Sequence, residues 1–153
     1  MNIFENYLSK INRIILDNKD NLNLNSTDNL RSVNLEVPPE HFNFDLSTNV
    51  SLVLSKVNKI DPNNLAKNIR KLLLENINYF EIIEIAGPGF LNIKLSKEGL
   101  AFNINEIFKN KRTYGSKKSE KKYNIEFVSA NPTGPMHVGH CRGAIFGDVL
   151  SNL

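Results

Sequence analysis

The chain has few of the residues that mark secreted or membrane proteins. Its 153 residues include no tryptophan and one cysteine, Cys141, which excludes an internal disulfide and favours a reducing cytosol. No apolar run reaches the roughly 18 residues that cross a bilayer, and no basic region followed by an apolar core is present at the N-terminus. We therefore expect a cytoplasmic protein without a membrane segment.

Net charge is also low, but it is unevenly distributed. The formal charge is +3, which alone does not indicate a nucleic-acid partner. One acid, Glu120, stands among seven basic residues in a short stretch: Lys109, Lys111, Arg112, Lys117, Lys118, Lys121 and Lys122. Such a run suits a polyanion, and it also suits a solvated linker.

Residues 1–60 carry one strand pattern between two helix patterns. Apolar residues spaced by three and four from Phe4 to Ile15 predict a first helix. The alternating residues 32–37, which end at a pair of prolines, predict a short strand. A second helix is predicted over 45–57, where Leu46, Val50, Val53, Leu54 and Val57 share one helical face.

Residues 61–110 have clearer boundaries. Asp61 followed by Pro62 predicts a helix over 61–77. Two apolar runs, 79–86 and 90–95, flank a Gly-Pro-Gly turn and predict a hairpin. Ser96 is expected to cap a helix through about Phe108. Residues 1–110 are thus predicted to form one α+β domain, a small sheet packed with helices, and 111–122 a basic linker.

The pattern changes after the linker. The run YNIEFV (123–128) predicts a strand, SANPTGPM (129–136) a Pro/Gly loop, and the residues from His140 onward a helix. A strand, a loop and a helix in this order make the first unit of a parallel, Rossmann-like nucleotide-binding sheet. Such a sheet needs further strands, so residues 123–153 are expected to be the start of an incomplete α/β domain.

Two histidines bracket a glycine where this loop meets the helix. His137 and His140 can donate hydrogen bonds to phosphate oxygens at a helix N-terminus, where anions are already favoured, and Gly139 lets a ligand approach the backbone. A metal site is the alternative, but Cys141 is the only other soft ligand nearby. The histidines can also be simple packing residues, as we expect of Cys141.

Two longer motifs resemble one family. HVGH resembles the HIGH signature of class I aminoacyl-tRNA synthetases, and IEFVSANPTGPMHVGHCRGAIFGD (125–148) is similar to the arginyl-tRNA synthetase version. Upstream, EIAGPGFLNIKL (84–95) resembles the signature of that family's additional N-terminal domain. The resemblance implies an arginine–tRNA ligase, with this chain an N-terminal portion cut early in the catalytic domain. It also implies a cytoplasmic enzyme that is a monomer when complete.

The resemblance also implies roles for particular residues. His137 and His140 are expected to be catalytic and, with Gly139, to bind ATP, which Mg²⁺ accompanies without a protein metal ligand. The residues expected to bind L-arginine are Glu126, Ser129 and Asn131. A carboxylate such as Glu126 can accept two hydrogen bonds from the planar guanidinium, although an exposed strand residue is the alternative.

The same resemblance implies contact with tRNA(Arg). Phe90 and Asn92 lie in the hairpin expected to touch the D-loop, where an aromatic ring can stack on an unpaired base and an amide can read its edge. The alternative for Phe90 is a core position. The rival interpretation of the whole chain is a truncated, non-catalytic tRNA-binding module formed by residues 1–115.

Overall fold

The computed structural model of the chain describes residues 2–116, 121–131 and 133–152. It divides into two compact units, residues 1–115 (unit 1) and 116–153 (unit 2). Each unit is described by itself.

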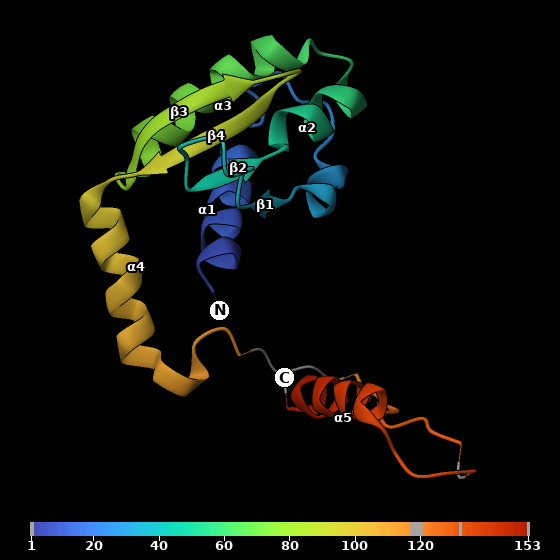
Figure 1. Ribbon diagram of the computed structural model, residues 1–153. Helices are drawn as coiled ribbons and strands as arrows, with labels where there is room; N and C mark the ends of the chain where they lie inside the picture. Colours follow the sequence, from blue (N-terminus) through green and yellow to red (C-terminus); the bar gives the residue numbers. More distant parts are fainter. Residues whose placement is uncertain (1, 117–120, 132, 153) are drawn as a thin grey trace. The chain divides into compact units, whose positions relative to one another are not determined.

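Unit 1 combines helices with one four-stranded antiparallel sheet (Figure 1). The strands, in the order β1-β2-β4-β3 across the sheet, are β1 (Leu35–Glu36), β2 (Leu46–Thr48), β4 (Phe90–Leu95) and β3 (Phe80–Ala86). The helices are α1 (Ile3–Asp17), α2 (Val50–Asn58), α3 (Pro62–Asn76) and α4 (Lys97–Asn110), with short 3-10 turns at Asp28–Ser32 and Lys111–Thr113. The findings therefore support the predicted α+β class for this part of the chain.

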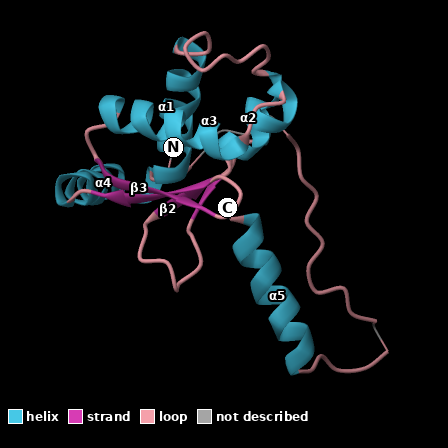
Figure 2. Cartoon of the chain, turned by 90° about the horizontal axis from the view of Figure 1, so that it is seen from above, coloured by secondary structure: helices cyan, strands magenta, loops and turns pink. Residues whose placement is uncertain are grey.

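The core lies between one face of the sheet and three helices. Figure 2 shows α1, α2 and α3 on one side of the strands. Alternate strand residues, such as Ile83, Leu91 and Ile93, point to this side and are fully buried. They join Ile11 of α1 and Ile69 of α3 in a single hydrophobic cluster. The intervening strand residues face away from these helices, and this second face stays available for polar groups.

Local signals fix several elements as predicted. Asp61 accepts a hydrogen bond from the Asn64 N–H at 2.8 Å, with Pro62 as the first residue of α3. Ser96 caps α4 by accepting from the Gly99 N–H at 3.1 Å. The first helix and the β3–β4 hairpin also form where the sequence places them.

The helix predicted over 45–57 is wrong in its first part. Leu46–Thr48 form strand β2 and pair with β1 and β4, so α2 begins only at Val50. All three β2 residues are buried. The spacing of Leu46 and Val50 fits a helix equally well, and pairing with distant strands decided the outcome. Of the strand predicted over 32–37, only β1 forms.

Unit 2 contains one helix, α5 (Val138–Ser151), among its described residues. The strand predicted over 123–128 is absent, and the start of a Rossmann-like sheet is therefore not shown. A strand needs a partner for its backbone hydrogen bonds, and the described part of unit 2 holds none. Val128 also adopts a left-handed φ of 63°, which interrupts extended backbone.

Phe127, in the segment 123–128, packs closely against α5 at Gly147. Gly147 is the one buried residue of α5, and a Cβ built there would lie 2.0 Å from the Cβ of Phe127. No helix among the described residues is long and apolar enough to cross a membrane.

Candidate functional site

The two histidines of unit 2 cap helix α5 reciprocally. His137 is the N-cap residue, and its Nδ1 accepts a hydrogen bond from the Gly139 N–H at 3.1 Å. In return, Nδ1 of His140 accepts from the His137 N–H at 3.1 Å. The two rings stack with their centroids 3.9 Å apart. Imidazoles thus occupy both positions of a capping box, which serine and glutamate usually fill.

This cap defines which nitrogen of each ring carries the proton. A backbone N–H can only donate, so each Nδ1 must present a lone pair. In the neutral imidazole the proton is then on Nε2. Each ring therefore offers one Nε2–H donor that the cap does not use.

Gly139 makes this arrangement sterically possible. A Cβ at position 139 would lie 2.9 Å from Cε1 and 3.1 Å from Nδ1 of His137. Any larger residue would push the His137 ring off the backbone N–H that it caps. Gly139 thus has a structural role in the cap, in addition to the close ligand approach that the motif predicts.

Four of the six residues predicted to bind ATP or arginine line one hollow. Ser129, Asn131, His137 and His140 border an open cavity of about 380 Å³. Its remaining lining residues come from the Pro/Gly loop, Ala130, Thr133, Gly134 and Pro135. Glu126 and Gly139 do not line it, and the Glu126 side chain is exposed.

Within the described residues, no three side chains of histidine, cysteine, aspartate or glutamate converge as metal ligands would. Cys141, predicted to be a packing residue, is instead exposed on α5. Gly147 is the one buried residue of α5, so the described part of unit 2 does not bury Cys141.

The predicted tRNA-binding residues lie on the sheet face away from α1, α2 and α3. Phe90 and Asn92 of β4 border a hollow of about 320 Å³, together with Pro39 and Phe42 of the β1–β2 loop and Ser47 of β2. Phe90 is half-buried and is not part of the hydrophobic core. The alternative of a core role for Phe90 is therefore wrong.

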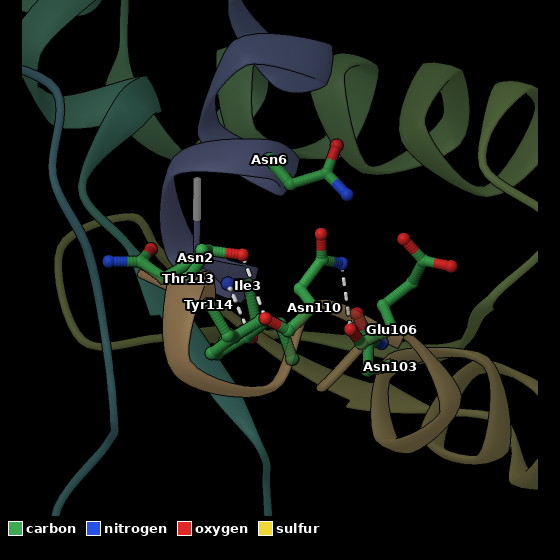
Figure 3. Close-up of a pocket in the computed structure, with 8 residues that line it drawn as sticks. All are labelled: Asn2, Ile3, Asn6, Asn103, Glu106, Asn110, Thr113 and Tyr114. Atoms are coloured by element: carbon green, nitrogen blue, oxygen red, sulfur yellow. Dashed lines mark hydrogen bonds between the residues drawn. The ribbon is translucent and has the colours of Figure 1, made fainter. Parts of the chain in front are cut away.

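A third hollow, of about 280 Å³, lies between the start of α1 and the end of α4, where no sequence motif indicates a site (Figure 3). Its lining groups largely bond to one another. The Ile3 N–H donates to the Tyr114 hydroxyl at 3.1 Å, and Asn110 Nδ2 donates to the Glu106 carbonyl at 2.8 Å. Asn103 donates to the Tyr7 hydroxyl at 3.1 Å. The bonds of Tyr114 with Ile3 and of Asn103 with Tyr7 fasten the turn after α4, and α4 itself, to α1.

Comparison with known families agrees with the motifs in both units. Residues 103–153 match the family described as tRNA synthetases class I (R), catalytic domain. Residues 3–95 match the family described as arginyl tRNA synthetase N terminal domain. The chain belongs to the arginyl-tRNA synthetase family.

Individual relatives match the whole chain but only part of themselves. An arginine–tRNA ligase from Pelagibacter ubique is 48% identical over 100% of this chain and 27% of its own length. One from Bartonella quintana is 45% identical over 100% of this chain and 26% of its own length. The chain therefore spans about a quarter of the length of these relatives.

The fold is also found in a solved structure. The crystal structure of arginyl-tRNA synthetase from Plasmodium falciparum matches with a TM-score of 0.63 over 94% of this chain and 27% of its own. At 22% sequence identity, the likeness concerns the fold alone.

Proposed function

We propose that this chain is the N-terminal portion of an arginine–tRNA ligase, which activates L-arginine with ATP and transfers it to tRNA(Arg). The observation that carries the proposal is the pair of Nε2–H donors of His137 and His140 at the start of α5, beside Ser129 and Asn131 in one hollow. Family membership supplies the reaction class.

The histidines act on the triphosphate. The arginine carboxylate attacks the α-phosphate of ATP, a new O–P bond forms, and pyrophosphate leaves. Negative charge builds on the phosphate oxygens during this step, and preorganised donors stabilise it. The Nε2–H groups of His137 and His140 and the N-terminus of α5 are those donors, and Gly139 keeps the backbone open to the nucleotide. Mg²⁺ enters with ATP, and no residue of this chain is assigned to hold it.

Three polar residues receive arginine. Ser129 and Asn131 border the same hollow as the histidines, and Asn131 holds the α-amino end. Glu126 pairs with the guanidinium, since a carboxylate can accept two hydrogen bonds from that planar group. Glu126 lies three residues before Ser129 on the same segment.

The N-terminal region receives the tRNA. Residues 1–110 form the D-loop-binding domain, 111–122 a basic linker, of which 117–120 lie outside the described residues, and 123–153 the start of the catalytic domain. Phe90 is half-buried beside its hollow, which suits stacking on an unpaired base. We place the enzyme in the cytoplasm, as a monomer in its complete form.

A chimera tests the proposal directly. This chain replaces the matching 27% of the Pelagibacter ubique enzyme, and arginine-dependent ATP–pyrophosphate exchange is measured with tRNA(Arg) present. The chimera should catalyse exchange, and the matched chimera carrying His140→Ala should lose about a hundredfold of the rate. A folded chimera with no exchange above the His140→Ala level would refute the proposal.

One observation favours the second candidate, a non-catalytic tRNA-binding module. Unit 1 has a closed hydrophobic core, whereas α5 buries only Gly147. In that case the 153-residue chain binds tRNA(Arg), while the chimera does not activate arginine. The exchange assay therefore separates the two functions.

A further inference from the structure

A polar row crosses the sheet on the face away from α1, α2 and α3. The strand register places Glu36 of β1 opposite Ser47 of β2, Ser47 opposite Asn92 of β4, and Asn92 opposite Glu84 of β3. Directly opposed residues point to the same face, with their Cβ atoms about 5 Å apart. The two central residues are buried, with Asn92 4% and Ser47 6% exposed, and the two glutamates are exposed.

The centre of the row is a hydrogen bond between side chains. Ser47 Oγ donates to Asn92 Oδ1 at 2.8 Å. No described residue accepts a hydrogen bond from Asn92 Nδ2. The amide oxygen is thus engaged, and the NH₂ group is the part of Asn92 left for another partner.

Glu84 favours the same orientation of the amide. An ionised carboxylate can only accept hydrogen bonds, and Glu84 is the direct cross-strand neighbour of Asn92. If the amide were flipped, its oxygen would face the Glu84 side while its NH₂ group faced the serine. The charge of Glu84 therefore adds to the serine bond in favouring the orientation with the amide oxygen toward Ser47 and the NH₂ group on the β3 side.

We infer that Ser47 is a positioning residue for RNA recognition, because it holds the Asn92 carboxamide so that its NH₂ group reads an acceptor on an unpaired nucleobase. Ser47 and Asn92 border the same hollow as the rings of Phe42 and Phe90, where an aromatic ring provides stacking without base selection. The inference rests on the proposed tRNA-binding function, in which Phe90 stacks and Asn92 reads the base edge, and it adds Ser47 as the residue that orients Asn92.

The test measures base preference separately from affinity. The 153-residue chain is titrated with tRNA(Arg) transcripts in which each unpaired D-loop nucleotide is made abasic, which locates the nucleotide that stacks. At that position the four bases are then compared. The wild-type chain should distinguish the best from the worst base by about tenfold, the value of one hydrogen bond at a base edge. Ser47→Ala should reduce this ratio below about threefold while the abasic loss stays the same.

Matched variants separate positioning from general damage. Ser47→Thr keeps the hydroxyl and should restore the preference. Asn92→Asp keeps the bond from Ser47 but replaces the NH₂ donor by an acceptor, so it should change which base is preferred. Ser55, a buried serine that donates to the Leu52 carbonyl of α2, provides the control Ser55→Ala, which should keep the wild-type preference.

The outcomes distinguish this inference from the proposed function. An unchanged base ratio in Ser47→Ala overturns the positioning role and leaves tRNA binding intact. A Ser47→Ala chain that also loses the abasic effect and melts earlier shows a structural role only, and it overturns the inference as well. If the wild-type chain is indifferent to every D-loop substitution, D-loop binding itself fails, and the inference fails with it.

Discussion

His140 has two separable tasks, capping α5 through Nδ1 and donating from Nε2. In the chimera, His140→Asn should keep the cap, because its amide oxygen can replace Nδ1, but should lose the Nε2–H donor. We predict that kcat for pyrophosphate exchange falls about a hundredfold, the value of one preorganised donor, with little change in the KM for arginine. A melting curve checks that the fold is retained. Unchanged kcat would remove His140 from the phosphate site.

Asn131 should behave differently from His140. It is proposed to hold the ground-state amino acid, so Asn131→Ala should raise the KM for arginine several-fold, about the value of one lost hydrogen bond, with a smaller change in kcat. Exchange kinetics at varied arginine concentration measure both parameters. If both variants instead damage every parameter equally and also melt earlier, the hollow has only a structural role.

Tyr7 makes the stability of unit 1 sensitive to alkaline pH. Burial raises the pKa of the Tyr7 hydroxyl above its ordinary value of 10.0, although the hydrogen bond from Asn103 opposes the shift. The folded state therefore binds this proton more tightly than the unfolded state. The stabilisation is complete below pH 10 and is lost as pH rises through the folded-state pKa.

Urea unfolding at pH 8, 10 and 11 tests the tyrosine. The free energy of unfolding should fall more steeply above pH 10 in the wild-type chain than in Tyr7→Phe, which has no hydroxyl to ionise. The other tyrosines remain in both proteins and serve as the internal control. Equal slopes for the two proteins would show that Tyr7 ionises alike in both states.

At the scale of the element, two glycines of α5 should respond oppositely to the same change. Gly143 has open space around it, so Gly143→Ala should stabilise the helix by about 0.5–1 kcal/mol. At Gly147 the new methyl group would collide with Phe127, so Gly147→Ala should detach residues 123–128 from the helix.

Two NMR measurements follow the response. Gly143→Ala should slow amide hydrogen exchange in α5. Gly147→Ala should weaken the nuclear Overhauser contact between the Phe127 side chain and residue 147 despite the same gain in helix propensity. An undiminished contact in Gly147→Ala would mean that the new methyl group does not displace the segment.

Elements with local signals were predictable from the sequence, and elements that depend on a distant partner were not. Asp61 and Ser96 are residue types that cap helix N-termini, and Pro62 is typical of a first helical position, so each marks a helix start locally. β2 exists because β1 and β4 flank it, and no local pattern contains that information. The same reason explains the missing strand at 123–128, which had the right residues but no described partner.

The candidate sites likewise have features that the sequence predicts and features that it does not. The histidine motif placed His137 and His140 at a helix start, which the structure shows. Their reciprocal cap was not predicted, because it depends on ring orientations that spacing does not define. The bond between Ser47 and Asn92 was equally hidden, since it spans 45 residues of sequence and requires the register of β2 to be known.

At the scale of the whole molecule, stability should differ between the two units. Unit 1 buries apolar residues from α1, α2, α3 and the sheet in one cluster, whereas large side chains of α5 such as Ile145 and Phe146 are exposed. A single helix with one contacting segment is marginal in water. We predict strong amide protection in the core elements of unit 1 and weak protection across 138–151 in the 153-residue chain. Equal protection of both regions would contradict this prediction.

The boundary between the two family matches does not coincide with the end of unit 1, because it falls at helix α4. The N-terminal family match ends at residue 95 and the catalytic match begins at 103, yet Asn103 and Tyr114 bond back to Tyr7 and Ile3 of α1. If a gene were divided between the two matches, Tyr7 would lose its hydrogen bond from Asn103, and α1 would lose the bond between Ile3 and Tyr114. Domain exchange among relatives therefore has its natural crossover after Gly115, where both partners of each bond are inherited together.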